Sequence, residues 1–199
     1  MLIIKDLSVR YRTDSGMVNG LKGLSLTCGR EKLGVVGVSG SGKSSLGRAI
    51  MRLLPDTAAI TAKEMSFGGR DLLQSDQKSA AYWRGREVAM IFQDPHLALN
   101  PIMKIGSQIT ETYKRHIGHE TLAARRYGLR LLEAVHITDP SLMWNSYPRE
   151  LSGGMAQRAM IALMLACNPQ FLIADEPTSA LDVLARQAVL EILDEQVES

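Results

Sequence analysis

One segment constrains this chain more than any other, a glycine-rich octapeptide that reads Gly37-Val38-Ser39-Gly40-Ser41-Gly42-Lys43-Ser44 and fits G-x-x-x-x-G-K-[ST] at every fixed position. Glycines let successive backbone N–H groups turn inward around a polyphosphate, and a helix that starts near Lys43 adds its positive end. In such a loop the lysine neutralises the β- and γ-phosphate oxygens, and the Ser44 hydroxyl ligates Mg²⁺. We therefore expect the loop to bind a nucleoside triphosphate rather than to be merely flexible.

The residues on either side of the octapeptide predict the context that the motif requires. Residues 32–36 are mainly apolar and predict a short buried strand that runs into the loop. Residues 44–54 predict the helix that follows, which Pro55 stops.

A second acidic site follows another apolar run. Residues 171–174 read Phe-Leu-Ile-Ala and deliver Asp175 to the carboxyl edge of a sheet, where ligands bind in folds of this kind. Asp175 is expected to hold Mg²⁺ through water, and Glu176 to polarise an attacking water as general base. The alternative is an acidic turn before Pro177.

Strands that alternate with helices predict an α/β fold with a parallel core. Leu7, Val9 and Tyr11 alternate with polar residues as in a half-buried strand, and residues 88–92 predict another strand. A mostly helical block at 105–137 places Leu122, Leu129 and Leu132 on one helix face, and further helices are predicted at 152–167 and from about 183.

Composition excludes some classes of function. The formal net charge is +2 over 199 residues, so there is no strong electrostatic case for a nucleic-acid partner. Cys28 and Cys167 have no Cys or His nearby and are interpreted as buried small hydrophobes in a reducing cytoplasm. The longest apolar run, residues 160–167, is too short to cross a bilayer, so work at a membrane would need other subunits to do the crossing.

The segment Leu151-Ser152-Gly153-Gly154-Met155 resembles the signature motif of ABC transporters. Taken alone it is also compatible with an N-capped helix whose first turn is rich in glycine. Here it precedes the acidic strand by one helix, which is the order in that family, and residues 179–182 resemble the D-loop. Gln93 matches the glutamine of the Q-loop. Tyr11 matches the aromatic that stacks on adenine, or is simply a packed strand aromatic.

The resemblance covers essentially the whole chain and implies the ABC ATPase fold: a P-loop NTPase core, an antiparallel β-subdomain and an inserted helical subdomain. It implies one nucleotide-binding domain over residues 1–199 that is C-terminally incomplete, with core and β-subdomain in 1–95 and 151–199 and helical subdomain in 96–150. In that family two such domains pair head to tail, so Ser152 and Gly154 would act on the partner's γ-phosphate. The cofactors implied are ATP and Mg²⁺.

The resemblance assigns three sets of site residues. Its catalytic residues are Glu176, Lys43 and Gln93, and its metal ligands are Ser44, Gln93 and Asp175. Its nucleotide-contacting residues are Tyr11, Gly37, Ser39, Gly40, Ser41, Gly42, Lys43, Ser44, Ser45, Ser152, Gly153 and Gly154.

A finer resemblance, carried by residues 91–101 and 147–155, points to the peptide/nickel importer branch. It implies an ATPase on the cytoplasmic face of the membrane that powers import of a peptide, nickel or a metal chelate. The partners implied are two permeases and a periplasmic or extracellular solute-binding protein, with residues 96–101 near the permeases or simply in a turn. The family's switch histidine would lie beyond Ser199, so we expect ATP binding from this chain, and the sequence leaves open whether this chain alone hydrolyses ATP.

Two other classes of function share the phosphate loop but predict other sequence features. A soluble ABC protein of DNA repair, chromosome organisation or translation would carry long coiled coils or a second phosphate loop, and the span between Gln93 and Ser152 is short. A P-loop kinase or GTPase has no need of the signature segment, and a preference for GTP in a nucleotide panel would favour it.

Overall fold

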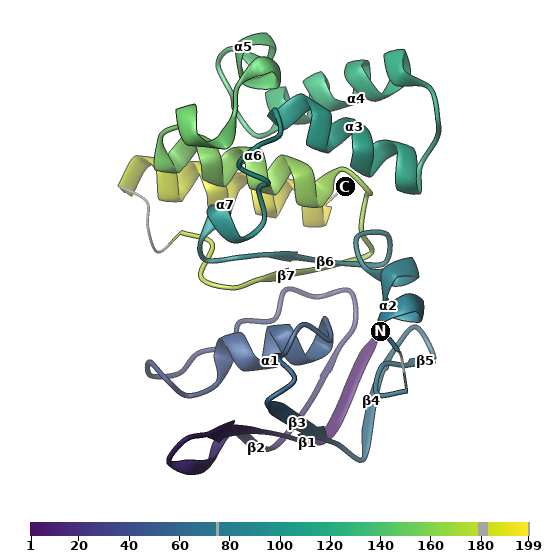
Figure 1. The fold of residues 1–199 in the computed structure, drawn as a ribbon, viewed down its shortest axis with the longest axis vertical. Coiled ribbons are helices and arrows are strands. Elements are labelled where there is room, and N and C mark those ends of the chain that lie inside the picture. Colours follow the sequence, from purple (N-terminus) through teal and green to yellow (C-terminus); the bar gives the residue numbers. More distant parts are fainter. Residues whose placement is uncertain (75, 179–182, 199) are drawn as a thin grey trace. The chain divides into compact units, whose positions relative to one another are not determined.

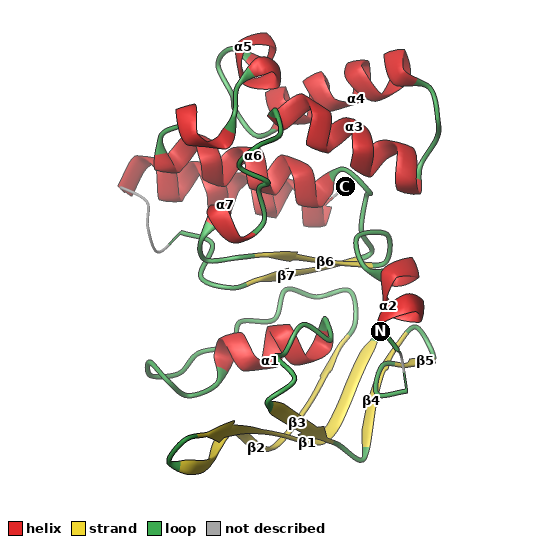
Figure 2. Cartoon of the chain, viewed as in Figure 1, coloured by secondary structure: helices red, strands yellow, loops and turns green. Residues whose placement is uncertain are grey.

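The computed structural model of the chain describes residues 1–74, 76–178 and 183–198. It forms two compact units, Met1–Arg84 and Gly85–Ser199. Figure 1 follows the chain through both units, and Figure 2 shows that antiparallel strands dominate the first unit and helices the second. The predicted helical block at 96–150 lies within the second unit. The predicted grouping of residues 1–95 with 151–199 stays a prediction.

The first unit is built on an antiparallel sheet. Strand β1 (Leu2–Thr13) forms a hairpin with β2 (Gly16–Cys28) and also pairs with β3 (Ala58–Thr61) and β4 (Glu64–Phe67), and β4 pairs with β5 (Arg70–Asp71). Leu7 and Val9 are fully buried, whereas the next residue of the strand, Arg10, is exposed, as the alternation predicted. The antiparallel β-subdomain expected from the sequence is therefore present.

Helix α1 (Lys43–Ile50) begins inside the octapeptide and ends four residues before the predicted limit. The chain leaves the helix at Arg52, whose φ of 54° is left-handed. The Arg84 guanidinium, just after α2 (Gln77–Trp83), donates hydrogen bonds of 2.7 Å to the carbonyls of Met51 and Arg52. A cation that satisfies carbonyls beyond the last turn also interacts favourably with the helix dipole, so Arg84 anchors the helix that follows the phosphate loop.

The predicted buried strand at residues 32–36 is wrong. Residues 32–38 have no regular secondary structure, and Val36 is 96% exposed. A strand exists only where its backbone pairs with a neighbour, and an all-apolar strand needs cover on both faces. The antiparallel sheet of the first unit offers this run neither a parallel ladder nor a covering layer among the residues that the structure describes.

The second unit holds a parallel strand pair covered by helices. Strand β6 (Val88–Ile91) pairs in parallel with β7 (Phe171–Ala174), and Ile91 is opposite Ala174. The helices are α3 (Ile105–His116), α4 (Thr121–Ala134), α5 (Pro140–Asn145), α6 (Gly153–Leu165) and α7 (Val183–Glu198), with short turns η1 (Pro95–Leu97) and η2 (Pro148–Glu150). Helix α6 packs against β6 and is contacted in turn by α3 and α4 (Figure 1).

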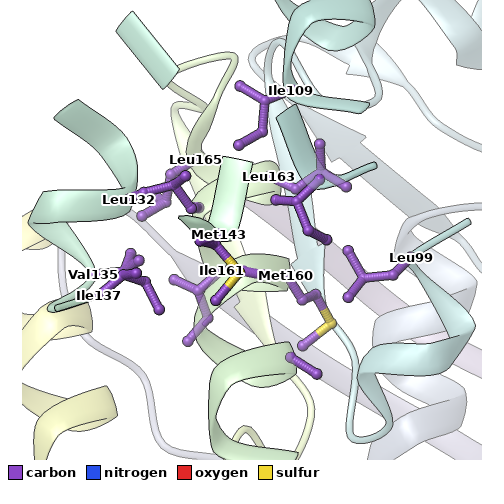
Figure 3. Packing of buried hydrophobic residues seen from close by; sticks show 14 of the residues in the cluster. Leu99, Ile109, Leu132, Val135, Ile137, Met143, Met160, Ile161, Leu163 and Leu165 are labelled. Atoms are coloured by element: carbon purple, nitrogen blue, oxygen red, sulfur yellow. The ribbon is translucent and has the colours of Figure 1, made fainter. Parts of the chain in front are cut away.

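Apolar side chains from all these elements form one core. Met160 and Ile161 of α6 are fully buried among Ile109, Leu132 and Met143 from α3, α4 and α5 (Figure 3). Helix α6 is buried on nearly every side, because β6 packs against it and helices α3 and α4 contact it as well. The core therefore fixes the position of α6, whose first turn carries the signature segment.

The apolar face predicted for α4 is wrong at one position. Leu132 is fully buried, but Leu122 is 75% exposed. The buried side of α4 instead runs through Ala124, Gly128 and Leu132 at four-residue spacing. Small residues take this side because the indole of Trp144 lies against it, and a Cβ on Gly128 would overlap that ring.

Gly128→Ala tests this close packing. Alanine gains about 1 kcal/mol of helix propensity over glycine, whereas overpacking a core costs about 1–3 kcal/mol. We expect overpacking to prevail, because the new methyl would also lie 2.8 Å from Ile109 Cγ2, so the variant should unfold at lower urea than wild type. The control is Arg126→Ala at an exposed position of α4. Equal unfolding midpoints for the two variants would contradict the packing argument.

Candidate functional site

The octapeptide forms a tight exposed loop in front of α1. The Ser41 N–H donates to the carbonyl of Val38 at 3.2 Å, and Gly42 is the N-cap of α1 with a φ of 97°. A Cβ on Gly42 would overlap the Gly20 carbonyl and lie 2.7 Å from Leu21 Cδ2. Left-handed backbone and close approach of β2 both require glycine here, so the last glycine of the motif fixes the entry into the helix.

The Lys43 side chain bends back over the loop. Its Nζ donates to the carbonyls of Gly37 at 2.9 Å and Val38 at 3.1 Å. An ammonium held at the mouth of a loop of backbone N–H groups, at the positive end of a helix, suits a polyphosphate anion. Ser44 follows directly in the first turn of α1, and Ser39, Gly40 and Ser41 are exposed at the loop surface.

Tyr11 connects β1 to the same helix. Its hydroxyl lies 2.9 Å from Ser45 Oγ, and its ring lies against Gly20 of β2. Tyr11 is therefore packed and hydrogen-bonded in this structure, with its ring half-buried beside the helix of the phosphate loop. Its stacking on adenine stays a prediction.

The carboxyl ends of the parallel strands bring three predicted residues to one edge. The Asp175 N–H donates to the Ile91 carbonyl at 3.0 Å and so extends the β6–β7 ladder by one residue. Gln93 Nε2 lies 3.3 Å from Glu176 Oε2. Asp175 is buried at 9% exposure, whereas Glu176 is exposed. The structure thus assembles Gln93, Asp175 and Glu176 from segments that are 83 residues apart.

The backbone at Glu176 is unusual. Its φ is 46°, in the left-handed region where a residue with a side chain is strained by about 1–2 kcal/mol. The next carbonyl, of Pro177, accepts a hydrogen bond of 2.8 Å from Gln157 Nε2 on α6. Sequence reasoning gave Gln157 no role; its one signal was an amide within a helix that is otherwise almost entirely apolar.

The signature segment caps α6. Ser152 is the N-cap, and its Oγ accepts from the Met155 N–H at 3.4 Å. Ser152 and Gly153 are exposed, and open space surrounds the position of a Cβ on Gly153. A hydroxyl and bare N–H groups at an exposed helix start suit an anion from outside the chain. Residues 179–182, which resemble the D-loop, lie outside the described residues.

These features are divided between the two units. The first unit carries the phosphate loop, Tyr11 and Ser45, and the second carries the Gln93–Glu176 edge and the signature helix. Hydroxyl, amide and carboxylate oxygens at Ser44, Gln93 and Asp175 are the hard ligands that Mg²⁺ prefers, so the donor chemistry fits that ion. No helix in the described ranges is long and apolar enough to cross a membrane.

A phosphate loop before a helix, with an acidic pair at the carboxyl edge of a parallel strand pair, defines a P-loop nucleotide-binding protein. Residues 21–179 match the family model described as ABC transporter. With 159 of 199 residues inside that match, the chain belongs to the ABC transporter family, and its fold is that of an ABC ATPase cassette.

Similar proteins support this assignment. The oligopeptide transport ATP-binding protein OppD of Bacillus subtilis is 44% identical over 97% of the chain and 54% of its own length. The dipeptide transport ATP-binding protein DppD of Escherichia coli is 42% identical over 97% of the chain and 59% of its own length. The chain thus spans between half and three fifths of these relatives. A dimeric ATP-binding cassette, MJ0796, solved in a post-hydrolysis state with ADP and Pi, superimposes with a TM-score of 0.87 at 25% identity, covering 100% of the chain and 83% of that structure.

Proposed function

We propose that this chain is the ATP-binding and ATP-hydrolysing cassette of an importer that takes up peptides, with nickel or a metal chelate as the alternative cargo. The observation that carries the proposal is the Gln93–Glu176 contact of 3.3 Å at the end of the parallel strands. A carboxylate able to accept a proton there lies beside an amide able to orient the attacking water. The relatives named for oligopeptide and dipeptide transport support a peptide as cargo.

Each side chain has a distinct task in this proposal. Lys43 exchanges the carbonyls of Gly37 and Val38 for β- and γ-phosphate oxygens. Glu176 takes the proton of the attacking water, and Gln93 orients that water. Bound Mg²⁺ supplies charge neutralisation, and the residues that would hold it are Ser44, Gln93 and, through water, Asp175.

The exposed start of α6 supports action on a second cassette. Ser152 and Gly153 are exposed at the start of the helix, and the half-buried Gly154 follows them in the same turn with its own N–H. In a head-to-tail pair these groups meet the γ-phosphate held by the partner's phosphate loop. The dimeric state of the similar cassette supports such a pairing. ATP then favours the closed dimer, because only that state completes both sites.

The loop after Gln93 supports docking to the permeases on the cytoplasmic face. Leu97 is 64% exposed and Ile102 82% exposed. The buried amide of Gln108 holds this loop by donating to the carbonyls of Asn100 and Met103 at 3.0 and 2.9 Å and accepting from the Asn100 N–H at 2.9 Å. Two exposed apolar side chains on a rigid turn suit a hydrophobic groove on a partner. A solute-binding protein outside the membrane would supply the cargo.

Co-purification and uptake test the proposal. The complete protein, expressed with the permeases of its neighbouring genes, should co-purify with them and drive ATP-dependent uptake of a labelled oligopeptide in proteoliposomes. Ile102→Asp should abolish co-purification but keep ATP binding. Leu122→Asp, at an equally exposed leucine of α4, is the control and should change neither. Uptake of labelled nickel instead of the oligopeptide would overturn the peptide assignment, and ATP-independent uptake would overturn the function.

A further inference from the structure

Gln157 is a buried polar residue on an apolar helix. It is 2% exposed, and its neighbours Ala156, Ala159 and Met160 on α6 are at most 1% exposed. A buried amide without a partner is strongly unfavourable, so its hydrogen bond is informative. Its Nε2 donates to the carbonyl of Pro177 at 2.8 Å, across 20 residues of sequence.

The acceptor of this bond lies directly after Glu176. Glu176 adopts the left-handed backbone conformation that residues with a side chain rarely occupy, with a φ of 46°. Such a conformation persists only where the surroundings determine it. The Asp175 N–H is fixed on one side by the Ile91 carbonyl at 3.0 Å, and the Pro177 carbonyl is fixed on the other by Gln157. The two bonds hold the backbone on both sides of Glu176, whose carboxylate lies 3.3 Å from Gln93 Nε2.

The other end of the connection is the start of α6. Gln157 lies five residues after Ser152, which is about 7.5 Å along a helix axis. The first turn and Gln157 belong to one continuous helix: the Ala156 N–H donates to the Ser152 carbonyl at 2.8 Å, and most of the helix is buried from Ala156 onward. The hydrogen bond of Gln157 therefore connects the helix that begins with Ser152–Gly154 to the Pro177 carbonyl.

We propose that Gln157 is a positioning residue for ATP hydrolysis, which holds the Glu176 turn in place from the signature helix. This inference rests on the proposed function of Glu176 as general base. In a head-to-tail dimer the same bond links the segment that contacts one ATP to the carboxylate that acts at the other. Gln157 thereby makes hydrolysis at one site depend on contact with nucleotide at the second.

Gln157→Met in the complete protein tests the bond with little change in volume. We expect kcat for ATP to fall about tenfold or more, while the KM and the Kd for ATP stay within about twofold, because the bond of Gln157 goes to the Pro177 carbonyl, which is not among the groups expected to contact nucleotide. The matched control is Arg158→Met. Arg158 is the next residue of α6 and also donates a 2.8 Å hydrogen bond to a backbone carbonyl. Its acceptor is the carbonyl of His136, which is not part of the Glu176 turn. Thermal unfolding of both variants separates loss of stability from loss of positioning.

Gln157→Glu gives a second signature. An ionised carboxylate has no proton to donate to the Pro177 carbonyl, whereas the protonated acid does. The ratio of variant to wild-type kcat should therefore rise as pH falls. A kcat of Gln157→Met within twofold of wild type, a loss no greater than that of Arg158→Met, or a ratio for Gln157→Glu that falls as pH falls would each overturn the proposal. If instead the proposed role of Glu176 as general base is wrong, the Glu176→Gln variant will keep full ATPase activity.

Discussion

Lys43→Ala is expected to abolish ATP binding at micromolar nucleotide. The Lys43 Nζ lies at the mouth of the phosphate loop, 2.9 Å from the Gly37 carbonyl and 3.1 Å from that of Val38. Alanine removes the one side-chain cation within the octapeptide and with it the charge-assisted bonds to phosphate. Such bonds contribute about 1.5–3 kcal/mol each, so the loss corresponds to a Kd roughly 100-fold higher.

Isothermal titration of the complete protein with ATP and Mg²⁺ measures this change. The control is Lys63→Ala, which removes an exposed lysine that pairs with Asp6 at 3.1 Å in the same unit. Its Kd should equal that of wild type. Because Lys43 also bonds its own loop, thermal unfolding without nucleotide should be recorded for both variants. Unchanged ATP affinity in Lys43→Ala, with normal folding, would remove the octapeptide from the nucleotide site.

The secondary structure that the sequence predicted well around the site is local. The helix that begins at Lys43 follows from the residues of the octapeptide and those directly after it. The β7 strand and the Asp175-Glu176 pair that ends it are equally local. Gln93 and Glu176 meet because the parallel strands β6 and β7 bring their carboxyl ends to one edge; the α/β pattern predicted the parallel strands, and the family resemblance alone singled out Gln93.

The parts that the sequence predicted poorly depend on tertiary partners. The apolar run at 32–36 has the composition of a buried strand, but composition does not say which backbone will pair with it. Leu122 was placed on the buried face of α4 by spacing alone, whereas the indole of Trp144 selects the side that carries Gly128. Gln157 was not predicted as a site residue, because its hydrogen bond to the Pro177 carbonyl, 20 residues away in sequence, is visible only in the folded chain.

Glu176→Gln is expected to lower kcat for ATP by about 100-fold or more while ATP binding is retained, because removal of a general base typically costs 10²–10⁴ in rate. Glutamine has the size of glutamate but does not accept a proton from the attacking water. The amide should keep its place beside Gln93, whose Nε2 is 3.3 Å from the present carboxylate oxygen. Because hydrolysis no longer opens the closed state, ATP should trap a dimer of cassettes.

Size-exclusion chromatography with ATP and Mg²⁺ and a phosphate-release assay on the complete protein measure the two effects together. Glu133→Gln, at an exposed glutamate of α4 in the same unit, is the matched control and should hydrolyse ATP at the wild-type rate without a trapped dimer. A Glu176→Gln variant that turned over normally would exclude this carboxylate as the base. A variant that lost both turnover and ATP binding would instead show that Glu176 shapes the nucleotide site, since a group needed only to accept the proton leaves ground-state affinity unchanged.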